Sequence, residues 1–334
     1  MPSKFNPSLS AAKATKQDEF YTQLSDIEKE LRHYTKHFKN KTVLCNCDDP
    51  KVSNFFHYFS HNFEKLKLKK LITTCYKNCD ADLFSKNTEE SGIYLEYYGN
   101  KSASSVPDPD EIGIRKFKSD GDFRSEECVR LLKEADIVVT NPPFSLFREY
   151  VEQLVKYKKQ FLIIGNQNAI TYKEIFEPIK KNKMWLGNNH PVAFRVPDHY
   201  EMRKVRSWRD ENGTNWRSHG NACWFTNMDI KKRHEELISV KQYGPKEYLT
   251  YDNYNAIEVS RYKNIPTDYD GIMGVPVTFL EYYNPEQFEI VGSDYEVKQG
   301  LLPGLLKRNW KGKTDRGYIN GKRLFARILI RRKR

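Results

Sequence analysis

Short apolar segments alternate with helix-favouring segments between residues 25 and 186, and this alternation constrains the fold more than any other feature of the chain. Parallel strands need a crossover connection, usually a helix, so this order predicts a mostly parallel, doubly wound α/β sheet. The expected strands are residues 42–46, 70–75, 93–98, 136–140, 161–164 and 184–186. The expected helices are one that begins near Ser25, with a Ser25–Glu28 capping box, and residues 52–66, 123–133, 146–157 and 171–180.

The pattern changes near Gly187. Beyond it, Gly, Pro, Asn and aromatic residues are frequent and helical periods are few, which predicts an irregular, β-rich region. Residues 1–17 are small, polar and basic, so we expect a disordered tail there. The sequence thus predicts three parts: the tail (1–17), an α/β domain (18–186) and a second region (187–334).

Hydropathy and cysteine spacing indicate a cytoplasmic protein without a metal. No apolar stretch has the length of a membrane span, and the N-terminus has no apolar signal core, so we expect no membrane partner. Cysteines in the cytoplasm are reduced. The spacing of Cys45, Cys47, Cys75 and Cys79 is poor for zinc, and cysteines beside strands are more often small core residues.

The net charge of +12 is concentrated at one end of the chain. Residues 305–334 contain twelve Lys or Arg and one acid, Asp315, a composition suited to contacts with a phosphate backbone. The alternative is a solvated basic tail. Trp310, Tyr318 and Phe325 are interleaved with the charges, and residues 325–330 are expected to form a strand, so the sequence favours a folded surface that faces nucleic acid.

The tetrapeptide Asn141-Pro142-Pro143-Phe144, at the end of an expected strand, carries the clearest chemical signal. The Asn141 side-chain oxygen and a neighbouring backbone carbonyl are two acceptors that would favour pyramidal nitrogen in an exocyclic amine and turn its lone pair outward. Pro142 restricts Asn141 to extended geometry, and the ring of Phe144 can stack on a flat base. The alternative is a stiff loop, since Asn-Pro commonly opens turns. Ligands bind outside the carboxyl ends of strands in open α/β sheets, which favours the functional interpretation.

Five stretches in one order carry a family resemblance: Asp18-Glu-Phe-Tyr-Thr22, Cys45-Asn-Cys-Asp-Asp-Pro50, Gly121-Asp-Phe-Arg124, Val138–Tyr150 and Gly274–Leu280. The chain resembles the adenine-specific DNA methyltransferases of the EcoRI type, modification enzymes that use S-adenosylmethionine. The resemblance runs from about Asp18 to Phe288, resumes near Tyr318, and is thinnest between Asn188 and about Arg217. It implies a Rossmann-like methyltransferase fold in residues 18–186, with target recognition and basic DNA contacts in residues 187–334.

The resemblance implies methyl transfer to the exocyclic amine (N6) of an adenine flipped out of duplex DNA. Asn141 and the carbonyl of Pro142 would accept the amine protons, and Phe144 would stack on the base. The residues implied at the cofactor are Tyr21 and Thr22, beside Phe20 in a lid segment, and Asn46, Asp48, Asp49, Asp122, Phe123 and Asn141. The residues expected at the DNA are Pro143 and Phe144, with Arg195, Arg206 and Arg209 as candidates for bidentate contacts to bases.

Simpler structural roles remain open for several of these residues. Asp48 and Asp49 could cap the following helix, and Asp122 or Ser125 could cap the helix after them. The Phe20-Tyr21 pair could be a hydrophobic staple. The chain also departs from the wider methyltransferase class, which has a Gly-x-Gly turn after the first strand. The resemblance identifies no acid for the cofactor ribose, since residues 74–76 occupy its usual place.

Other functions also remain open. The Asn-Pro-Pro-aromatic signature serves methyltransferases of RNA and of protein glutamine, and a non-catalytic DNA-binding protein is a third alternative. The extra region and the basic C-terminus favour DNA, and the intact motif favours catalysis. Methylation at a cytosine ring carbon would need a Pro-Cys pair, which the chain lacks. We expect a monomer that acts either as an orphan or beside a restriction endonuclease that shares its site without binding it.

Overall fold

The computed structural model describes residues 20–76, 91–99, 107–196, 202 and 205–333. The expected disordered tail (1–17) and Cys79 lie outside this range. The chain divides into two compact units, one made of residues 1–175 and 186–228 and the other of residues 176–185 and 229–334. The expected boundary after residue 186 separates a catalytic domain from a DNA-recognition region, and this functional division stays a prediction.

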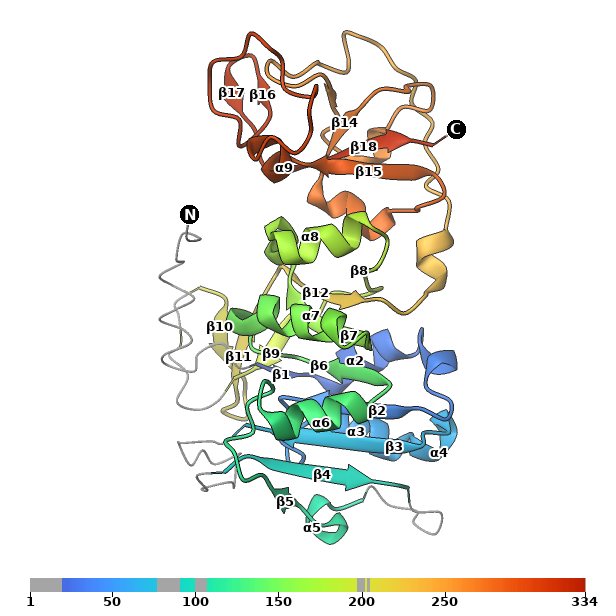
Figure 1. Ribbon diagram of the computed structural model, residues 1–334, viewed down its shortest axis with the longest axis vertical. Helices are drawn as coiled ribbons and strands as arrows, with labels where there is room; N and C mark the ends of the chain where they lie inside the picture. Colours follow the sequence, from blue (N-terminus) through green and yellow to red (C-terminus); the bar gives the residue numbers. More distant parts are fainter. Residues whose placement is uncertain (1–19, 77–90, 100–106, 197–201, 203–204, 334) are drawn as a thin grey trace. The chain divides into compact units, whose positions relative to one another are not determined.

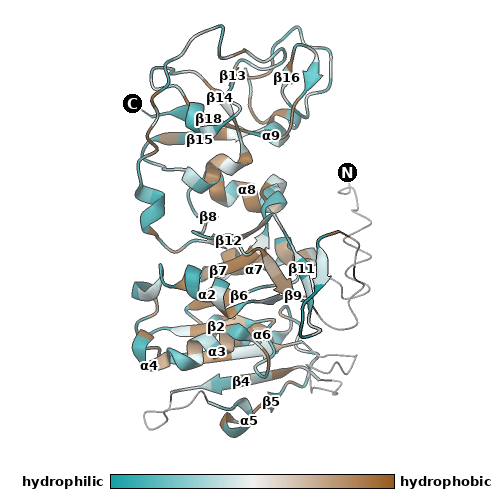
Figure 2. Ribbon diagram, turned by 180° about the vertical axis from the view of Figure 1, so that it is seen from behind, coloured by the Kyte–Doolittle hydropathy of each residue, from teal (hydrophilic) through white to brown (hydrophobic). Residues whose placement is uncertain are grey.

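The first unit has an α/β architecture built on one sheet of eight parallel and antiparallel strands, in the order β5-β4-β3-β2-β6-β7-β12-β8 (Figure 1). Its centre is four parallel strands, β3 (Lys70–Cys75), β2 (Thr42–Asn46), β6 (Ile137–Thr140) and β7 (Gln160–Asn166). Antiparallel neighbours follow at both sides, namely β4 (Ile93–Tyr97), β5 (Arg115–Lys116) and β12 (Ala222–Thr226), with β8 (Trp185–Leu186) at the end. Strands β2 and β6 are buried along their length and β7 is buried except at its two ends, and β7 is coloured hydrophobic in Figure 2.

The expected strands are confirmed, within one or two residues at their ends, and most of the expected helices form. The helices of this unit are α2 (Leu24–Leu31), α3 (Asn54–His61), α4 (Phe63–Leu66), α5 (Pro109–Ile112), α6 (Glu126–Glu134) and α7 (Phe147–Lys156). Helix α8 (Lys173–Lys180) begins in this unit, and its residues from Phe176 on belong to the second unit. Two expectations are wrong. The first helix begins at Leu24 with Gln23 as its N-cap, so Ser25 lies inside the helix and forms no capping box. The single helix expected over 52–66 is two helices, because the chain leaves helical geometry at Asn62 (ψ 12°).

A second, smaller sheet in this unit joins the N-terminal segment to the region after Gly187. Its antiparallel strands are β1 (Tyr21–Thr22), β9 (Ala193–Arg195), β11 (Asn215–Ser218) and β10 (Ser207–Arg209), in the order β1-β9-β11-β10. The expected β-rich character after residue 187 is therefore present, but its first strand pairs with a segment more than 170 residues earlier.

The second unit contains a four-stranded sheet in the order β13-β14-β18-β15. Its elements are β13 (Ile257–Glu258), β14 (Met273–Pro276), β18 (Arg327–Arg332), β15 (Phe288–Ser293), helix α9 (Asp294–Lys298) and the hairpin of β16 (Tyr318–Ile319) and β17 (Lys322–Arg323). The strand expected over 325–330 is shifted by two residues, because the chain enters the sheet only at Arg327.

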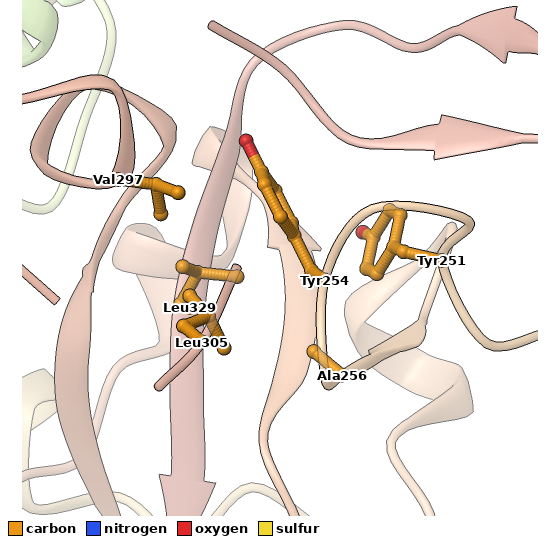
Figure 3. Close-up of a cluster of buried hydrophobic side chains, with 6 residues drawn as sticks. All are labelled: Tyr251, Tyr254, Ala256, Val297, Leu305 and Leu329. Atoms are coloured by element: carbon orange, nitrogen blue, oxygen red, sulfur yellow. The ribbon is translucent and has the colours of Figure 1, made fainter. Parts of the chain in front are cut away.

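A compact cluster of buried side chains holds the basic C-terminal segment in place in this unit. The cluster consists of Tyr251, Tyr254, Ala256, Val297, Leu305 and Leu329 (Figure 3), and Leu306, Ile319 and Leu324 pack against it. Residues 305–333 are thus folded, and the alternative of a solvated tail is wrong for this part of the chain.

The remaining short helices, which occur in both units, are the 3-10 helices η1 (Thr35–His37), η2 (Phe144–Leu146), η3 (Gln167–Thr171), η4 (Lys231–His234), η5 (Tyr262–Asn264) and η6 (Val277–Tyr282).

Candidate active site

The carboxyl ends of β2 and β6 form the point where the strand order of the main sheet reverses. From β2 the chain proceeds to β3 on one side, and it later returns to β6 on the other side of β2. The loops after two such strands diverge and leave a crevice, which is where open α/β sheets bind their ligands. The loop after β2 contains Asp48 and Asp49, and the loop after β6 contains Asn141.

Asn141 is held in one orientation by the N-terminal segment. Its Nδ2 donates to the carbonyl of Phe20 at 2.7 Å and lies 3.3 Å from the hydroxyl oxygen of Thr22. A carbonyl only accepts, so the amide nitrogen must face Phe20 and the oxygen must face away. That oxygen, Oδ1, is buried and receives no hydrogen bond from the described residues. A buried acceptor without a donor costs free energy, and a bound amine would remove this cost.

The two prolines of the motif differ in the use of their carbonyl groups. The Pro143 carbonyl accepts from the backbone N–H of Leu146 at 3.0 Å, which closes the 3-10 turn η2. No described residue donates to the carbonyl of Pro142. Asn141 and Pro142 therefore present two consecutive acceptors, as the sequence predicts.

Four rings from distant parts of the chain gather beside this motif. The ring of Phe144 lies 5.4 Å from that of Phe20 and 5.6 Å from that of His219, between centroids. Phe20 also contacts His219 at 4.2 Å and Phe194 at 5.9 Å. The expectation of a staple at Phe20-Tyr21 is wrong, because Phe20 packs into this cluster while Tyr21 begins a strand. The rings are tilted or edge-on to one another, with interplanar angles of 52° to 72°, and together they place aromatic surface beside the motif.

The loop after β2 turns at Cys47, which has a φ of 64°. Left-handed geometry of this kind is what glycine usually supplies, so Cys47 makes with a side chain the turn that the wider class makes with Gly-x-Gly. Asn46, just before it, is buried and accepts from the Thr74 hydroxyl at 2.7 Å. The alternative that Asp48 or Asp49 caps α3 is wrong, since Ser53 is the N-cap and accepts from the N–H groups of Phe55 and Phe56.

The two aspartates after the turn have different surroundings. Both Asp48 oxygens are engaged, one 3.1 Å from the Ser53 hydroxyl and the other 2.7 Å from the Thr140 hydroxyl. Asp49 accepts from the N–H of Lys51 at 2.9 Å through Oδ1, whereas its Oδ2 is buried and receives no hydrogen bond from the described residues. Asp49 is therefore the better placed of the two to accept from a ligand.

Asp48 connects the two loops of the crevice, and its pKa lies well above the ordinary value of a carboxyl group. Burial raises the pKa of Asp48 to about 7, against the lowering effect of its hydrogen bonds with Thr140 and Ser53. The Thr140 hydroxyl also contacts the carbonyl of Asn46, so its single proton faces two acceptors. A protonated Asp48 removes this conflict by donating to Thr140, which donates to Asn46.

We expect the stability of the protein to depend on the ionisation of Asp48. Its pKa is raised on folding, so ionisation destabilises the folded state as pH rises from about 4 to about 7. Relative to Asp48→Asn, the free energy of unfolding of the wild type should fall over this range and then level off. A pKa shift of this size corresponds to at most about 4 kcal/mol, and because the side chain is partly exposed to solvent, which weakens the shift, we expect a change of about 1–2 kcal/mol. Urea unfolding of both proteins across this pH range measures it, and a constant difference would refute the assignment.

Phe123 contacts Tyr150 of α7, and Tyr150 in turn lies near Cys47 and Asp48 in the loop after β2. The rings of Phe123 and Tyr150 are 5.1 Å apart, and both residues are buried. Burial raises the pKa of the Tyr150 hydroxyl, and the nearby Cys47 and Asp48 raise it further. Asp122 accepts from the N–H and the guanidinium of Arg124, while Ser125, not Asp122, caps α6. The cap alternative is thus confirmed for Ser125 and wrong for Asp122.

Comparison with known proteins agrees with this geometry. The sequence profile described as adenine-specific methyltransferase EcoRI matches residues 8–333. The chain belongs to the EcoRI family of adenine-specific DNA methyltransferases. It is 48% identical to the type II methyltransferase M.EcoRI of Escherichia coli, over 98% of this chain and 97% of that protein.

Two mycoplasma proteins are also similar to this EcoRI-family methyltransferase. The type II methyltransferase M.MgeORF184P of Mycoplasma genitalium is 38% identical, and M.MpnI of Mycoplasma pneumoniae is 34% identical. Each alignment covers 96% of this chain and 97% of the relative. No solved structure matches the chain. The family expected from the sequence is therefore confirmed, and the match continues through residues 188–217, where the resemblance is thinnest.

The expected base-reading arginines of this EcoRI-family methyltransferase do not form one surface. Arg195 pairs across the small sheet with Tyr21 and Trp216, so these three share a face. Arg209 pairs with Asn215, the neighbour of Trp216 in β11, and therefore lies on the opposite face. Arg206 precedes β10 with a φ of 63°. The structure thus brings Arg195, but not Arg209, to the same face as Tyr21, and base reading by these arginines stays a prediction.

The sequence did not indicate several residues that lie beside the candidate site of this methyltransferase. They are His219 and Phe194 in the aromatic cluster, Thr140 between the loops, Tyr150 beside Phe123, and Asn54. The Nδ2 of Asn54 donates to the Thr22 carbonyl at 2.7 Å. Thr140 had a signal, because a polar residue ends an apolar strand directly before the motif. His219 had none, since a single histidine between strands carries no pattern.

Two negative observations concern only the part of the methyltransferase that the structure describes. Within those ranges, no group of three His, Cys, Asp or Glu side chains is arranged to hold a metal ion. No helix in the same ranges has the length and apolarity needed to cross a membrane.

Proposed function

We propose that this methyltransferase transfers a methyl group from S-adenosylmethionine to the N6 amine of an adenine flipped out of duplex DNA. The observation that carries the proposal is the buried Oδ1 of Asn141, an acceptor to which no described residue donates, beside the carbonyl of Pro142, for which the described residues also supply no donor. An adenine amine has two protons, which these two acceptors match in number and kind. Phe144 and the rings around it supply an apolar surface on which the base can stack.

The loop after β2 fits the amino acid part of S-adenosylmethionine. The Oδ2 of Asp49 is a buried acceptor that needs a donor, and an ammonium group is one. Asn46 and Asp48 are neighbours of Asp49 in this loop. Tyr21 and Thr22 would line the other side of the cofactor site, where Thr22 contacts Asn54 and Asn141. Asp122 and Phe123 would contact the adenine ring of the cofactor. The bound cofactor supplies the methyl group, activated on a sulfonium centre.

The protein residues contribute position and electrostatics to the reaction. Asn141 and Pro142 hold the amine so that its lone pair points away from the base plane, and Phe144 fixes the plane of the base. Thr140 and Asp48 hold the loops that carry Asn141 and Asp49 at a constant separation. No covalent enzyme nucleophile takes part. The amine loses its extra proton after transfer, either to solvent or to a carboxylate.

The wider features fit the same function. We infer a doubly wound, Rossmann-like catalytic domain in residues 18–186 and a recognition region in residues 187–334 that contacts double-stranded DNA. Arg195, Arg206 and Arg209 are candidates to read bases, and Pro143 adjoins the flipped base. The relatives are named type II methyltransferases, so the enzyme protects DNA against a restriction endonuclease of the same specificity or acts as an orphan.

Replacement of Asp49 by Asn should weaken cofactor binding by about 10- to 100-fold, the range for loss of a charge-assisted hydrogen bond. Asn keeps the shape and the acceptor toward Lys51 but removes the charge. Calorimetric titration with S-adenosylmethionine measures the affinity. Asp110→Asn is the matched control, because Asp110 is an exposed carboxylate that pairs with Lys51 at 2.7 Å. Equal affinities in the two variants would exclude Asp49 from the cofactor site.

Modification-sensitive long-read sequencing tests the proposed function directly. The full chain is expressed in a methylation-deficient bacterial host and the DNA of that host is sequenced. We expect N6-methyladenine at one short recurrent motif. Unmodified DNA, from a folded protein that binds S-adenosylmethionine, would instead favour RNA or a protein glutamine as the substrate.

A further inference from the structure

Phe325 is presented to solvent by a fixed backbone in the second unit. Its side chain is 87% exposed, although the residue before it, Leu324, packs on the buried cluster. Two residues later, Arg327 makes a two-pronged ion pair with Glu258, with N–O distances of 2.6 and 3.0 Å. Phe325 therefore lies between two anchored residues, and its exposure does not result from a loose chain end.

The basic residues around it also belong to a folded scaffold. The loop of residues 251–255 holds the segment through the bonds from Asp252 N to the Tyr318 carbonyl, from Asn255 N to the Leu305 carbonyl and from Asn253 Nδ2 to the Arg316 carbonyl, each 2.8 Å long. The hairpin β16–β17 turns at Asn320 and Gly321, both with positive φ (49° and 72°), which is typical of a tight type I′ turn. The positions of its charges are thus set by the fold.

The charge on this scaffold is largely uncompensated. The one acid of the segment, Asp315, is paired with Arg323 at 2.6 Å. Exposed cations without an acidic partner among the described residues are Arg308, Lys311, Lys313, Lys322 and Lys333. An exposed aromatic ring on a fixed backbone costs free energy in water, so it indicates a contact surface. The positive charges near it in sequence favour a negatively charged partner over a neutral protein.

We propose that Phe325 enters a groove of the bound duplex, where its ring contacts deoxyribose and base edges, while the cations of residues 307–333 hold the flanking phosphates. DNA supplies both requirements of this surface, because its backbone attracts the cations and its groove walls offer apolar sugar and base surface. This inference rests on the proposed function, since it assumes that duplex DNA is the substrate.

The test measures the affinity of full-length variants for a labelled duplex by fluorescence anisotropy at several salt concentrations. The duplex contains the motif at which the wild type methylates adenine. Phe325→Ala should bind at least about tenfold more weakly with an unchanged salt slope, and Phe325→Leu should recover part of the loss. Lys322→Gln should instead lower the salt slope by about one. Ile238→Ala is the matched control, because Ile238 is 80% exposed in the same unit but follows Glu235 and Glu236.

A covalent probe adds a readout that a structural role would not change. p-Benzoylphenylalanine at position 325 should photo-crosslink the duplex, and the same group at position 238 should not. Wild-type duplex affinity in Phe325→Ala, or equal crosslinking at the two positions, would overturn the inference. Methylation by the wild type reports on the proposed function separately, so that either idea can fail alone.

Discussion

Replacing Asn141 by Ala should reduce the single-turnover rate of DNA methylation by about 10²–10³-fold, the usual loss when one oriented hydrogen-bonding group is removed from the reacting centre. The reason is the buried Oδ1 of Asn141, to which none of the described residues donates and which, under the proposed function, would accept from the adenine amine. The rate is measured with saturating cofactor and duplex, so that binding does not limit it. Duplex affinity should change little, because under the proposed function the motif would contact one base and residues 187–334 would supply the other contacts.

Asn54→Ala is the control that separates the acceptor from its support. Asn54 donates to the Thr22 carbonyl at 2.7 Å, so the variant loosens the N-terminal segment while leaving Oδ1 of Asn141 in place. We expect less than about a tenfold reduction in rate, in line with the loss of one ordinary hydrogen bond. If Asn141→Ala and Asn54→Ala lose rate equally, Asn141 acts through the position of the segment and not as an acceptor.

The second large effect should follow from Glu30, a buried carboxylate on α2. It accepts from the N–H groups of Asn188 and Asn189 at 2.8 Å each, from Asn189 Nδ2 at 3.0 Å and from the Tyr34 hydroxyl at 2.8 Å. The connection is tight, because a Cβ on Gly187 would lie 2.3 Å from Oε1 of Glu30. Glu30→Ala leaves these donors without their acceptor, so the free energy of unfolding should fall by about 3 kcal/mol.

Tyr34→Phe is the graded control for this prediction, because it removes one of the four donors and keeps the carboxylate. Its cost should be about 1 kcal/mol. Urea unfolding of both variants measures the two values. Glu30 tethers the segment that leads into β9, so Glu30→Ala should also weaken duplex binding. A cost no greater than that of Tyr34→Phe would mean that other contacts hold this connection.

The sequence predicted the strands of the main sheet well because their signals are local, but the expectation of a mostly parallel sheet is wrong, since the parallel pairs at its centre are flanked by antiparallel ones. The buried strands β2, β3, β6 and β7 are short apolar runs, and a run of this kind bounded by turns or helices has few other structures available. The errors occurred where local signals compete. Ser25 is a good cap by type, yet the helix starts one residue before it, and Asn62 breaks a helix that residue type alone would continue.

The candidate site was predictable where one segment contains both the strand and the chemistry. Asn141, Pro142 and Phe144 follow β6 directly, so order along the chain fixes their position at the end of that strand. The loop after β2 was found in the same way. Phe194, His219 and Asn54 were not, because each reaches the site from a separate element and none belongs to a pattern of its own.

The sequence by itself determined the family, the parallel core and the acceptor motif, since these depend on residues that are neighbours along the chain. Only the tertiary structure decided which polar atoms are already satisfied. Asp48 is engaged by Ser53 and Thr140, whereas within the described ranges nothing donates to one oxygen of Asp49 or to the Oδ1 of Asn141. It also paired β1 with β9 and turned Phe325 to solvent. Burial and hydrogen bonding between residues far apart in sequence depend on how the whole chain packs, and local pattern does not specify that.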